Sequence, residues 1–314
     1  MKFVTYESSD GRQVAGVLTT NDTRILPLQS FGDGKNSDLE SVQAVIEGGD
    51  EALGRVRGIL AEADQQGAET LPYESVRLLA PLPRPAQIRD VLCFLDHMRN
   101  AQRIGVELAG GDPSTYELPA IYEEAPMYYK ANRMNVVGHE AEVEWPAGCN
   151  LLDYELELGI VVGQQGKDIA RDKAKDYIFG YTIFNDVSAR DIQIKEMAAG
   201  LGPAKGKDFD TGNVLGPCIV TADEVDPAEM TMIARLNGEE ISRGSTRQMD
   251  HKVEDVISYI SKGETIYPGE ILGSGTVPLG CLMEHKRFLG DGDVVELEIQ
   301  GIGVLRNRFV KTPN

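Results

Sequence analysis

Long apolar runs are missing from this sequence, as are a surplus of basic residues and any closely spaced pair of cysteines. No run of about eighteen apolar residues occurs, so we expect no membrane-spanning helix. Acidic residues outnumber basic ones by 50 to 31, and the formal net charge of −19 argues against nucleic acid or an anionic membrane as a partner. The four cysteines show no CxxC spacing, which favours reduced thiols over disulfides or a zinc site.

Two further absences narrow the class of protein. The N-terminal sequence MKFVTYESSDGR has no apolar signal segment, so we expect a cytoplasmic protein. No GxGxxG motif follows a predicted strand and opens a helix, which argues against a dinucleotide-binding dehydrogenase. What is present is a chain of 314 residues with 41% apolar residues, enough to bury a core in one large domain or two modest ones.

The chain changes texture near residue 80. Residues 1–80 combine short alternating strands with helix-like stretches and read as a small N-terminal α/β module. The following stretch contains three closely spaced prolines and is expected to be an extended connector. Strand-like runs, IRDVLCFL among them, dominate residues 86–314. Only three helical stretches are predicted there, in HMRNAQRIG, SARDIQIKEMAAG and KVEDVISYISKG. This pattern is typical of a β-rich α+β domain of catalytic size.

The segment LLDYELELGIVVG, residues 151–163, carries three acids at every second position. As one strand it places Asp153, Glu155 and Glu157 on the same face, opposite a row of apolar side chains. A solvated strand face is one interpretation. The apolar surroundings of these acids, and of Asp186 in YIFGYTIFNDVSARD, favour another, since buried carboxylates are protonated, paired with cations or bound to a metal.

Several motifs follow one another along the chain. They are D-Y-E-x-E-L from residue 153, G-Y-T-x-x-N-D-V-S-A-R-D-x-Q from 180, K-x-F-D-T from 207, G-S-G-T from 273 and G-D-V-V-E-L-E-I-x-G-I-G-x-L-R-N from 292. In this order they resemble the fumarylacetoacetate hydrolase family. The likeness covers nearly all of residues 86–310 and implies that family's C-terminal fold, a mixed β-sandwich or roll. The first 20 residues are also similar to the small N-terminal module that many members carry.

The resemblance implies a divalent-metal site. In the family, the glutamates of D-Y-E-x-E-L and the first aspartate of N-D-x-S-A-R-D hold the ion, and here these are Glu155, Glu157 and Asp186. Some members add a carboxylate seven positions before a histidine, which makes Asp90, seven before His97, a candidate fourth ligand. Oxygen ligands suit hard ions, so we expect Mg²⁺, or Mn²⁺ or Ca²⁺ in its place.

The resemblance also implies an acid–base histidine. His97 falls on the family's D-H motif and is the predicted general base, although a lone histidine can equally be structural. Some members orient it with a glutamate three residues later, but that position is Asn100 here. Other members use a glutamate after the G-T motif, so Glu284, in GCLMEH, is the predicted partner. For Asp153 we expect a structural or hydrogen-bonding place.

Three donors are predicted to stabilise an enolate or oxyanion: Arg190, Gln193 and Lys207, with the first two on one face of a helix. The alternative for Arg190 is a surface salt bridge with Asp191 or Glu196.

Three other residues match family positions near the substrate: Tyr129, Lys130 and Thr276. Tyr129 can equally be a core residue. The glycine-containing loop at 194–206 is either a mobile lid or a plain connector.

The predicted activity is hydrolysis of a carbon–carbon bond in a small 1,3-diketone or acylpyruvate-type acid. His97 and the metal would activate water, and the enolate that leaves would be stabilised. Decarboxylation, isomerisation, hydration or dehydration of a 2-oxo acid on the same metal site is the alternative, and a non-catalytic metal-binding β protein is a third. The resemblance further implies a homodimer and a small-molecule substrate.

Overall fold

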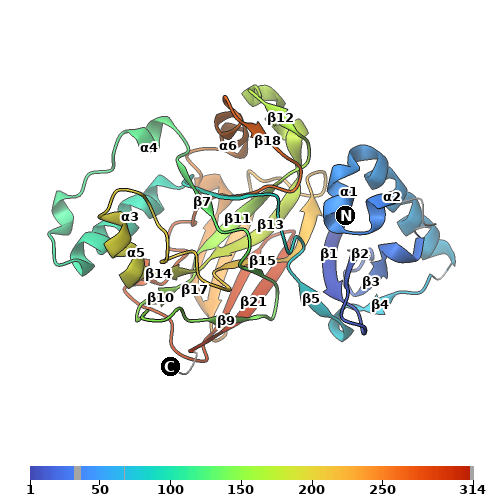
Figure 1. The fold of residues 1–314 in the computed structure, drawn as a ribbon, viewed down its shortest axis with the longest axis horizontal. Coiled ribbons are helices and arrows are strands. Elements are labelled where there is room, and N and C mark those ends of the chain that lie inside the picture. The colour runs from blue at the N-terminus through green and yellow to red at the C-terminus, as the bar shows by residue number, and fades with distance from the viewer. Residues whose placement is uncertain (32–36, 67, 312–314) are drawn as a thin grey trace.

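The structure is a computed structural model of the chain, and it describes residues 1–31, 37–66 and 68–311 (Figure 1). It confirms a strand-rich α+β fold. No helix in these ranges has both the length and the apolar character needed to cross a bilayer.

A twelve-stranded sheet runs through the described part of the molecule in the order β4-β3-β2-β1-β15-β13-β11-β19-β6-β7, with β5 paired to β1 and β8 paired to β15. Its strands are β1 (Lys2–Glu7), β2 (Gln13–Leu18), β3 (Arg24–Pro27), β4 (Leu71–Pro72), β5 (Arg77–Leu79), β6 (Ile88–Val91), β7 (Tyr128–Ala131), β8 (Val136–Val137), β11 (Leu156–Val162), β13 (Ile178–Asp186), β15 (Asn213–Thr221) and β19 (Ile271–Gly273).

A second sheet has the order β17-β16-β20-β21-β9. Its strands are β9 (Glu142–Glu144), β16 (Thr231–Leu236), β17 (Glu239–Ser245), β20 (Val294–Ile299) and β21 (Gly303–Val310). Two short pairs complete the described strands: β10 (Leu152–Asp153) with β14 (Ser188–Ala189), and β12 (Gly166–Lys167) with β18 (Thr265–Ile266).

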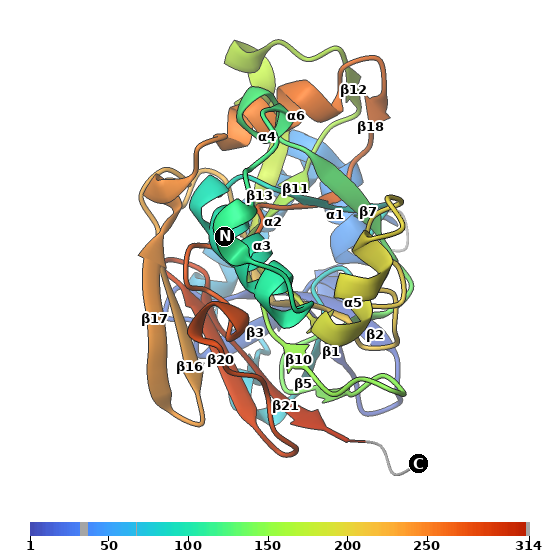
Figure 2. The same cartoon turned by 90° about the vertical axis from the view of Figure 1, so that its left-hand side faces the viewer.

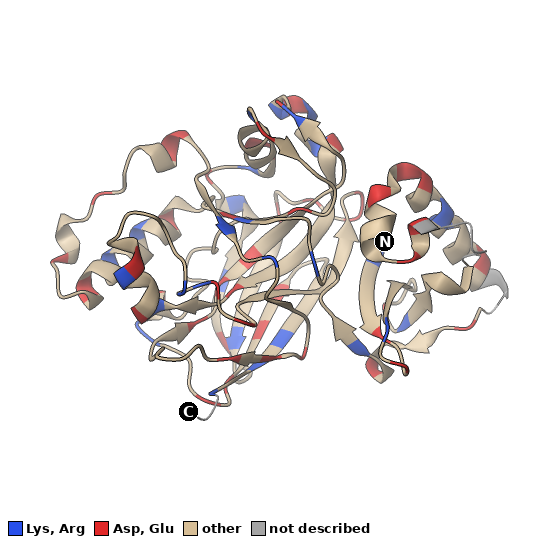
Figure 3. Ribbon diagram, viewed as in Figure 1, with Lys and Arg blue, Asp and Glu red and all other residues tan. Residues whose placement is uncertain are grey.

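The helices cover the ends of the large sheet (Figures 1 and 2). They are α1 (Val42–Glu47), α2 (Gly49–Gln66), α3 (Leu95–Leu108), α4 (Ile121–Glu124), α5 (Arg190–Met197) and α6 (Val253–Ile260). The N-terminal helices α1 and α2 carry much of the acidic surplus of their part of the chain (Figure 3).

The core lies on both faces of the central strands. Every residue of β11, β13 and β15 is buried, which explains their nearly continuous apolar sequences. Along β11, Ile160 packs into one apolar cluster and Val161 into another on the opposite face. The sheet is therefore a rigid base for the side chains at its strand ends.

The predicted N-terminal module joins the same sheet. Strand β1 pairs antiparallel with β15, with Phe3 opposite Ile219. The chain forms no helix or strand between β5 and β6, where the proline-rich connector was expected. The division into a small N-terminal module, residues 1–80, and a catalytic domain, residues 86–314, stays a prediction.

The prediction of one strand over residues 151–163 is wrong. Strand β10 ends at Asp153 and β11 begins at Leu156, and the two belong to different sheets. At the break, the backbone N–H of Glu155 donates to the side chain of Asn185 on β13 instead of to a backbone carbonyl. The three acids are buried but do not form one row.

Candidate active site

Three carboxylates meet above a glycine at the end of the central sheet. Asp186 ends β13, Glu157 lies near the start of β11, and Asp90 lies on β6. Strand β19 runs between β11 and β6, and its last residue is Gly273. A Cβ atom on Gly273 would stand 2.6 Å from Glu157 Oε2 and 2.9 Å from Asp90 Oδ1. The missing side chain thus leaves the space in which carboxylates from both sides converge.

This cluster fits a hard divalent cation. Asp90, Glu157 and Asp186 each place a carboxylate oxygen within 4.8 Å of the others, and all three residues are buried. Asp90 Oδ1, Glu157 Oε1 and Asp186 Oδ1 have no hydrogen-bond partner among the described residues. Buried carboxylate oxygens without partners are costly, and an all-oxygen set suits Mg²⁺, Mn²⁺ or Ca²⁺.

The raised pKa values of these three carboxyl groups also fit a site for a divalent cation. Burial raises the pKa of Asp90 to about 7, and the neighbouring charge of Asp186 adds to the effect. Burial likewise raises the pKa of Glu157 well above its usual range, with Asp90 contributing, and it raises the pKa of Asp186. A divalent ion would compete with these protons for the same oxygens.

Glu155 lies among cations instead of among the three converging carboxylates. Its Oε1 accepts from Arg190 Nη2 at 2.8 Å, and its Oε2 accepts from Lys207 Nζ at 2.6 Å. Burial opposes ionisation, but Arg190 and Lys207 hold the pKa of Glu155 well below its usual range. The Lys207 ammonium also bonds Asp186 Oδ2 at 2.5 Å. The predicted role of Glu155 as a metal ligand stays a prediction.

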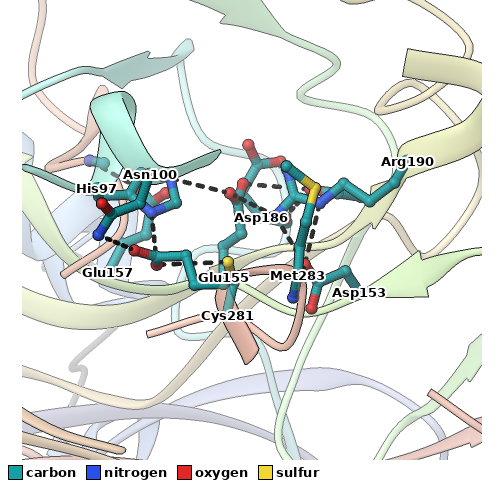
Figure 4. Close-up of polar contacts among 12 residues, drawn as sticks. His97, Asn100, Asp153, Glu155, Glu157, Asp186, Arg190, Cys281 and Met283 are labelled. Atoms are coloured by element: carbon teal, nitrogen blue, oxygen red, sulfur yellow. Dashed lines mark hydrogen bonds and ion pairs between the residues drawn. The ribbon is translucent and has the colours of Figure 1, made fainter. Parts of the chain in front are cut away.

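Arg190 begins α5 and points inward (Figure 4). It is 3% exposed and donates to Asp153 Oδ2 from Nε at 3.0 Å and from Nη2 at 2.8 Å. Asp153 also accepts from the backbone N–H groups of Leu282 and Met283. The expected structural place of Asp153 is confirmed. The alternative of a surface salt bridge from Arg190 to Asp191 or Glu196 is wrong.

His97 and Glu284 form a hydrogen-bonded pair across 187 residues of sequence. His97 Nδ1 lies 2.8 Å from Glu284 Oε2, and His97 Nε2 lies 3.6 Å from Glu155 Oε1. Burial lowers the pKa of His97, but contacts with Cys281, Glu155 and Glu284 outweigh it and raise the pKa well above its usual value. Asp250 fixes the start of helix α3 by accepting from the backbone N–H of Leu95 at 2.9 Å.

Sequence reasoning missed two contacts to this pair. Asn100 Nδ2 donates to Glu284 Oε1 at 3.1 Å, and Cys281 Sγ lies 3.5 Å from Glu284 Oε2. Asn100 lies one helical turn after His97, and that spacing was the available signal for its role. Cys281 lies three residues before Glu284, a similar spacing, whereas its contact with His97 arises only through the fold.

A cavity of about 290 Å³ opens onto these groups. It reaches between α3 and α5, the two helices in front of the sheet in Figure 2. Asp186 and Glu284 stand behind the residues of its wall. The predicted site residues that line it are Asp90, His97, Tyr129, Glu155, Glu157, Arg190, Gln193, Lys207 and Thr276.

The two neighbours on β7 differ in position. Tyr129 lines the cavity and donates its hydroxyl hydrogen to Asp186 Oδ2 at 2.5 Å. Lys130 is not part of the cavity wall; its side chain is 56% exposed and lies 3.8 Å from Glu264. Successive side chains on a strand point to opposite faces, so only one of the pair can face the site.

The segment after α5 folds back onto that helix. Glu196 accepts hydrogen bonds from the backbone N–H groups of Ala204, Lys205 and Gly206, just before Lys207. Ile194, Met197 and Pro203 contribute to the cavity wall. The segment is therefore tied to the site, and its movement as a lid stays a prediction.

Comparison with known proteins places this chain in a family. The family model described as fumarylacetoacetate (FAA) hydrolase C-terminal matches residues 87–310. Oxaloacetate tautomerase FAHD2A, a mitochondrial protein of Homo sapiens, is 34% identical over 298 residues, which are 94% of this chain and 87% of that protein.

Solved structures of similar fold support the same family. A fumarylacetoacetate hydrolase from psychrophilic Exiguobacterium antarcticum has a TM-score of 0.76 and 31% identity, covering 99% of this chain and 100% of that one. Maleylpyruvate hydrolase from Sphingobium sp. SYK-6, solved with manganese(II) and pyruvate, shares the fold with a TM-score of 0.75 at 22% identity, over 100% of both chains. The chain belongs to the fumarylacetoacetate hydrolase family.

Proposed function

We propose that this chain is a metal-dependent enzyme that moves a proton at the carbon between two carbonyl groups of a small 2-oxo acid, as in keto–enol tautomerisation of oxaloacetate. The observation that carries the proposal is the His97–Glu284 pair, held 2.8 Å apart beside the buried carboxylates. The similarity of the chain to a human oxaloacetate tautomerase, over 94% of its length, supports the choice of reaction.

Glu155, Glu157 and Asp186, with Asp90 as the candidate fourth ligand, would hold Mg²⁺, or Mn²⁺ or Ca²⁺. Three of them, Asp90, Glu157 and Asp186, converge in the structure. The ion would supply Lewis acidity toward the substrate's oxygens. In the family, a maleylpyruvate hydrolase structure contains manganese(II). The identity of the ion in this chain belongs to the proposal.

The protein's own groups move the proton. His97 lines the cavity, and its Nε2 atom exchanges a proton with the substrate carbon. Glu284 accepts from Nδ1 and stabilises the positive charge of the protonated ring. Removing the proton leaves negative charge on the substrate oxygens. Arg190 and Lys207, both buried cations on the cavity wall, favour that charge, and Gln193 adds a neutral donor. Delivery of the proton to the enolate oxygen gives the enol, and the reverse transfer from the enol hydroxyl to carbon gives the keto form.

Hydrolysis of an acylpyruvate-type diketone is the second candidate. The same His97 would accept a proton from water, which attacks the acyl carbonyl, and the carbon–carbon bond then breaks to give a carboxylic acid and the enolate of pyruvate. The cavity of about 290 Å³ favours this candidate, since it has room for water beside a small substrate. Decarboxylation, isomerisation and hydration or dehydration use the same enolate and remain alternatives.

Two assays separate these reactions. Decay of enol-oxaloacetate, followed by its ultraviolet absorbance, reports tautomerisation, and analysis of the product pool shows whether carbon dioxide is released. Acetylpyruvate loss with formation of pyruvate and acetate reports hydrolysis. We expect accelerated enol decay with Mg²⁺ or Mn²⁺, abolished by EDTA and in His97→Asn. Acceleration that survives in His97→Asn would refute the proposal, and acetylpyruvate cleavage without enol decay would make hydrolysis the function.

A homodimer and a cytoplasmic location also stay predictions. The human relative is a mitochondrial protein, so fractionation of the native organism's cells is the direct test of location. Sedimentation of the full chain tests the dimer.

A further inference from the structure

The cavity extends well beyond the charged groups that the proposed reaction needs. One continuous face of α3 forms its long wall, because the lining residues recur at the spacing of a single helical face. These residues are Met98, Ala101, Gln102, Gly105, Val106 and Ala109. From His97 to Ala109 the helix rises by about 18 Å, at roughly 1.5 Å per residue. The opposite wall includes Ile194 and Met197 of α5.

This extension is apolar. Among the lining residues, the cations Arg190 and Lys207 bond the carboxylates at one end, whereas the α3–α5 end contributes mainly methyl, methylene and thioether groups. Met197 lines the cavity and is still 39% exposed, so the extension opens to solvent on that side. A second carboxylate at that end of a substrate would find no cation on the wall, whereas a hydrocarbon chain would bury apolar surface.

Gly105 supplies independent support. Glycine disfavours a helix interior, yet Gly105 lies in α3. A Cβ atom on it would meet no atom within 4 Å, so no neighbouring group requires the glycine. The space in front of it belongs to the cavity. Ala101 and Ala109, one turn before and one turn after, are also small, and the three together form the floor of a groove.

We propose that the substrate of this enzyme is a 2-oxo acid with a second carbonyl group that carries a linear apolar chain, and that this chain lies between α3 and α5 over Gly105. The inference rests on the proposed function, which places the 2-oxo acid head at the carboxylate end. Oxaloacetate occupies the head region alone, so its turnover is compatible with a longer substrate.

N-Alkyl oxamates test the channel directly, because they present a 2-oxo acid head, are not substrates for proton transfer at carbon 3, and take chains of any length. Binding of the methyl, butyl and hexyl compounds to the full chain with Mg²⁺ is measured by calorimetry. We expect affinity to rise roughly fourfold for each methylene that becomes buried. In Gly105→Leu the hexyl compound should lose at least about tenfold in affinity, while the methyl compound binds as before.

Matched variants control for effects on folding. Gly58→Leu makes the same change in α2, where a Cβ also meets nothing within 4 Å, and should leave the whole series unchanged. Gly105→Ala should fold like the wild type and keep most of the gain with chain length. Thermal unfolding of each variant confirms that the native fold is retained.

The outcomes separate this inference from the proposed function. If N-methyl oxamate does not bind with Mg²⁺, the head site and the proposed function fail together. If it binds but the hexyl compound binds no tighter, the channel is refuted while the proposed function stands. A Gly105→Leu variant that weakens all chain lengths equally, or weakens none, also refutes the channel.

Discussion

Asn100 and His97 hold the same carboxylate from one helix: Asn100 donates to Glu284 Oε1 at 3.1 Å, and His97 Nδ1 lies 2.8 Å from Oε2. They lie three positions apart on α3, so one turn of helix supplies both the proposed acid–base group and a hydrogen bond to its partner. A position that departs from part of the family thus keeps a function in this chain.

Asn100→Ala should lower kcat by roughly tenfold, because a hydrogen bond to a charged group is lost and Glu284 is freed to turn. KM should change little, since Asn100 does not line the cavity. Arg99→Gln, which alters a half-buried neighbour that pairs with Asp96 and not with Glu284, is the control and should match the wild type. Equal losses in both variants would show a general effect on α3.

His97→Asn and Glu284→Gln should each lower kcat by roughly 10²-fold to 10⁴-fold, the range for loss of a general acid–base group. The double variant should be hardly worse than His97→Asn, because Glu284 acts through His97. Steady-state kinetics of the three variants give the comparison. Losses that multiply would mean that Glu284 contributes independently of His97.

Gly273→Ala should abolish metal binding, since its new Cβ would stand 2.6 Å from a Glu157 oxygen and 2.9 Å from an Asp90 oxygen. Titration with Mn²⁺, followed by electron paramagnetic resonance, measures the affinity. Gly54→Ala, on α2 with open space around it, should bind the ion normally. Normal Mn²⁺ affinity in Gly273→Ala would place the ion elsewhere.

In the metal-free protein, the contribution of Asp90 to the free energy of unfolding should fall as pH rises from about 4 toward 7. Burial raises the folded-state pKa of Asp90 from its usual 3.8 to about 7, so the folded protein binds a proton that the unfolded chain releases. Added Mg²⁺ should restore stability at pH 8. Denaturant unfolding at several pH values measures the slope, which should be shallower in Asp90→Asn. Identical slopes in the two proteins would contradict this assignment.

Asp153→Ala should lower the free energy of unfolding by about 3–5 kcal/mol, because it leaves the buried Arg190 with less compensation and removes the acceptor of two backbone N–H groups. Asp153→Asn should lose less, since an amide oxygen can still accept. Urea unfolding measures both. A loss below about 1 kcal/mol for alanine would show that water replaces the carboxylate.

Much of the fold follows from local sequence. The apolar runs around Ile160 and Ile183 predict buried strands, and the three helices predicted after residue 86 appear as α3, α5 and α6. The break before Leu156 does not follow, because alternation cannot show that Asn185 will take the hydrogen bond of Glu155. The prediction that IRDVLCFL is all strand is also wrong, as β6 ends at Val91 and α3 starts at Leu95.

The candidate site, like the fold, was predictable from the sequence only in part. Motifs indicated the acids, His97, Glu284 and the three donors, and the structure brings these residues together around one cavity. The convergence over Gly273 could not be read from spacing, because it depends on β19 entering between β11 and β6. That arrangement includes a parallel pairing of β19 with β6, a contact between segments about 180 residues apart whose register no local pattern encodes.

Because β1 pairs with β15, the N-terminal segment covers part of one edge in the sheet that carries the site. Strand β15 is buried along all nine residues, and β8 covers only its first two. Removing the N-terminal segment would expose the backbone of β15 at Ile219 and Val220, where β1 pairs, and unpaired apolar strand edges of this kind recruit other chains into aggregates. The first strand of the protein therefore protects the sheet from edge-to-edge association without contacting the proposed reacting groups.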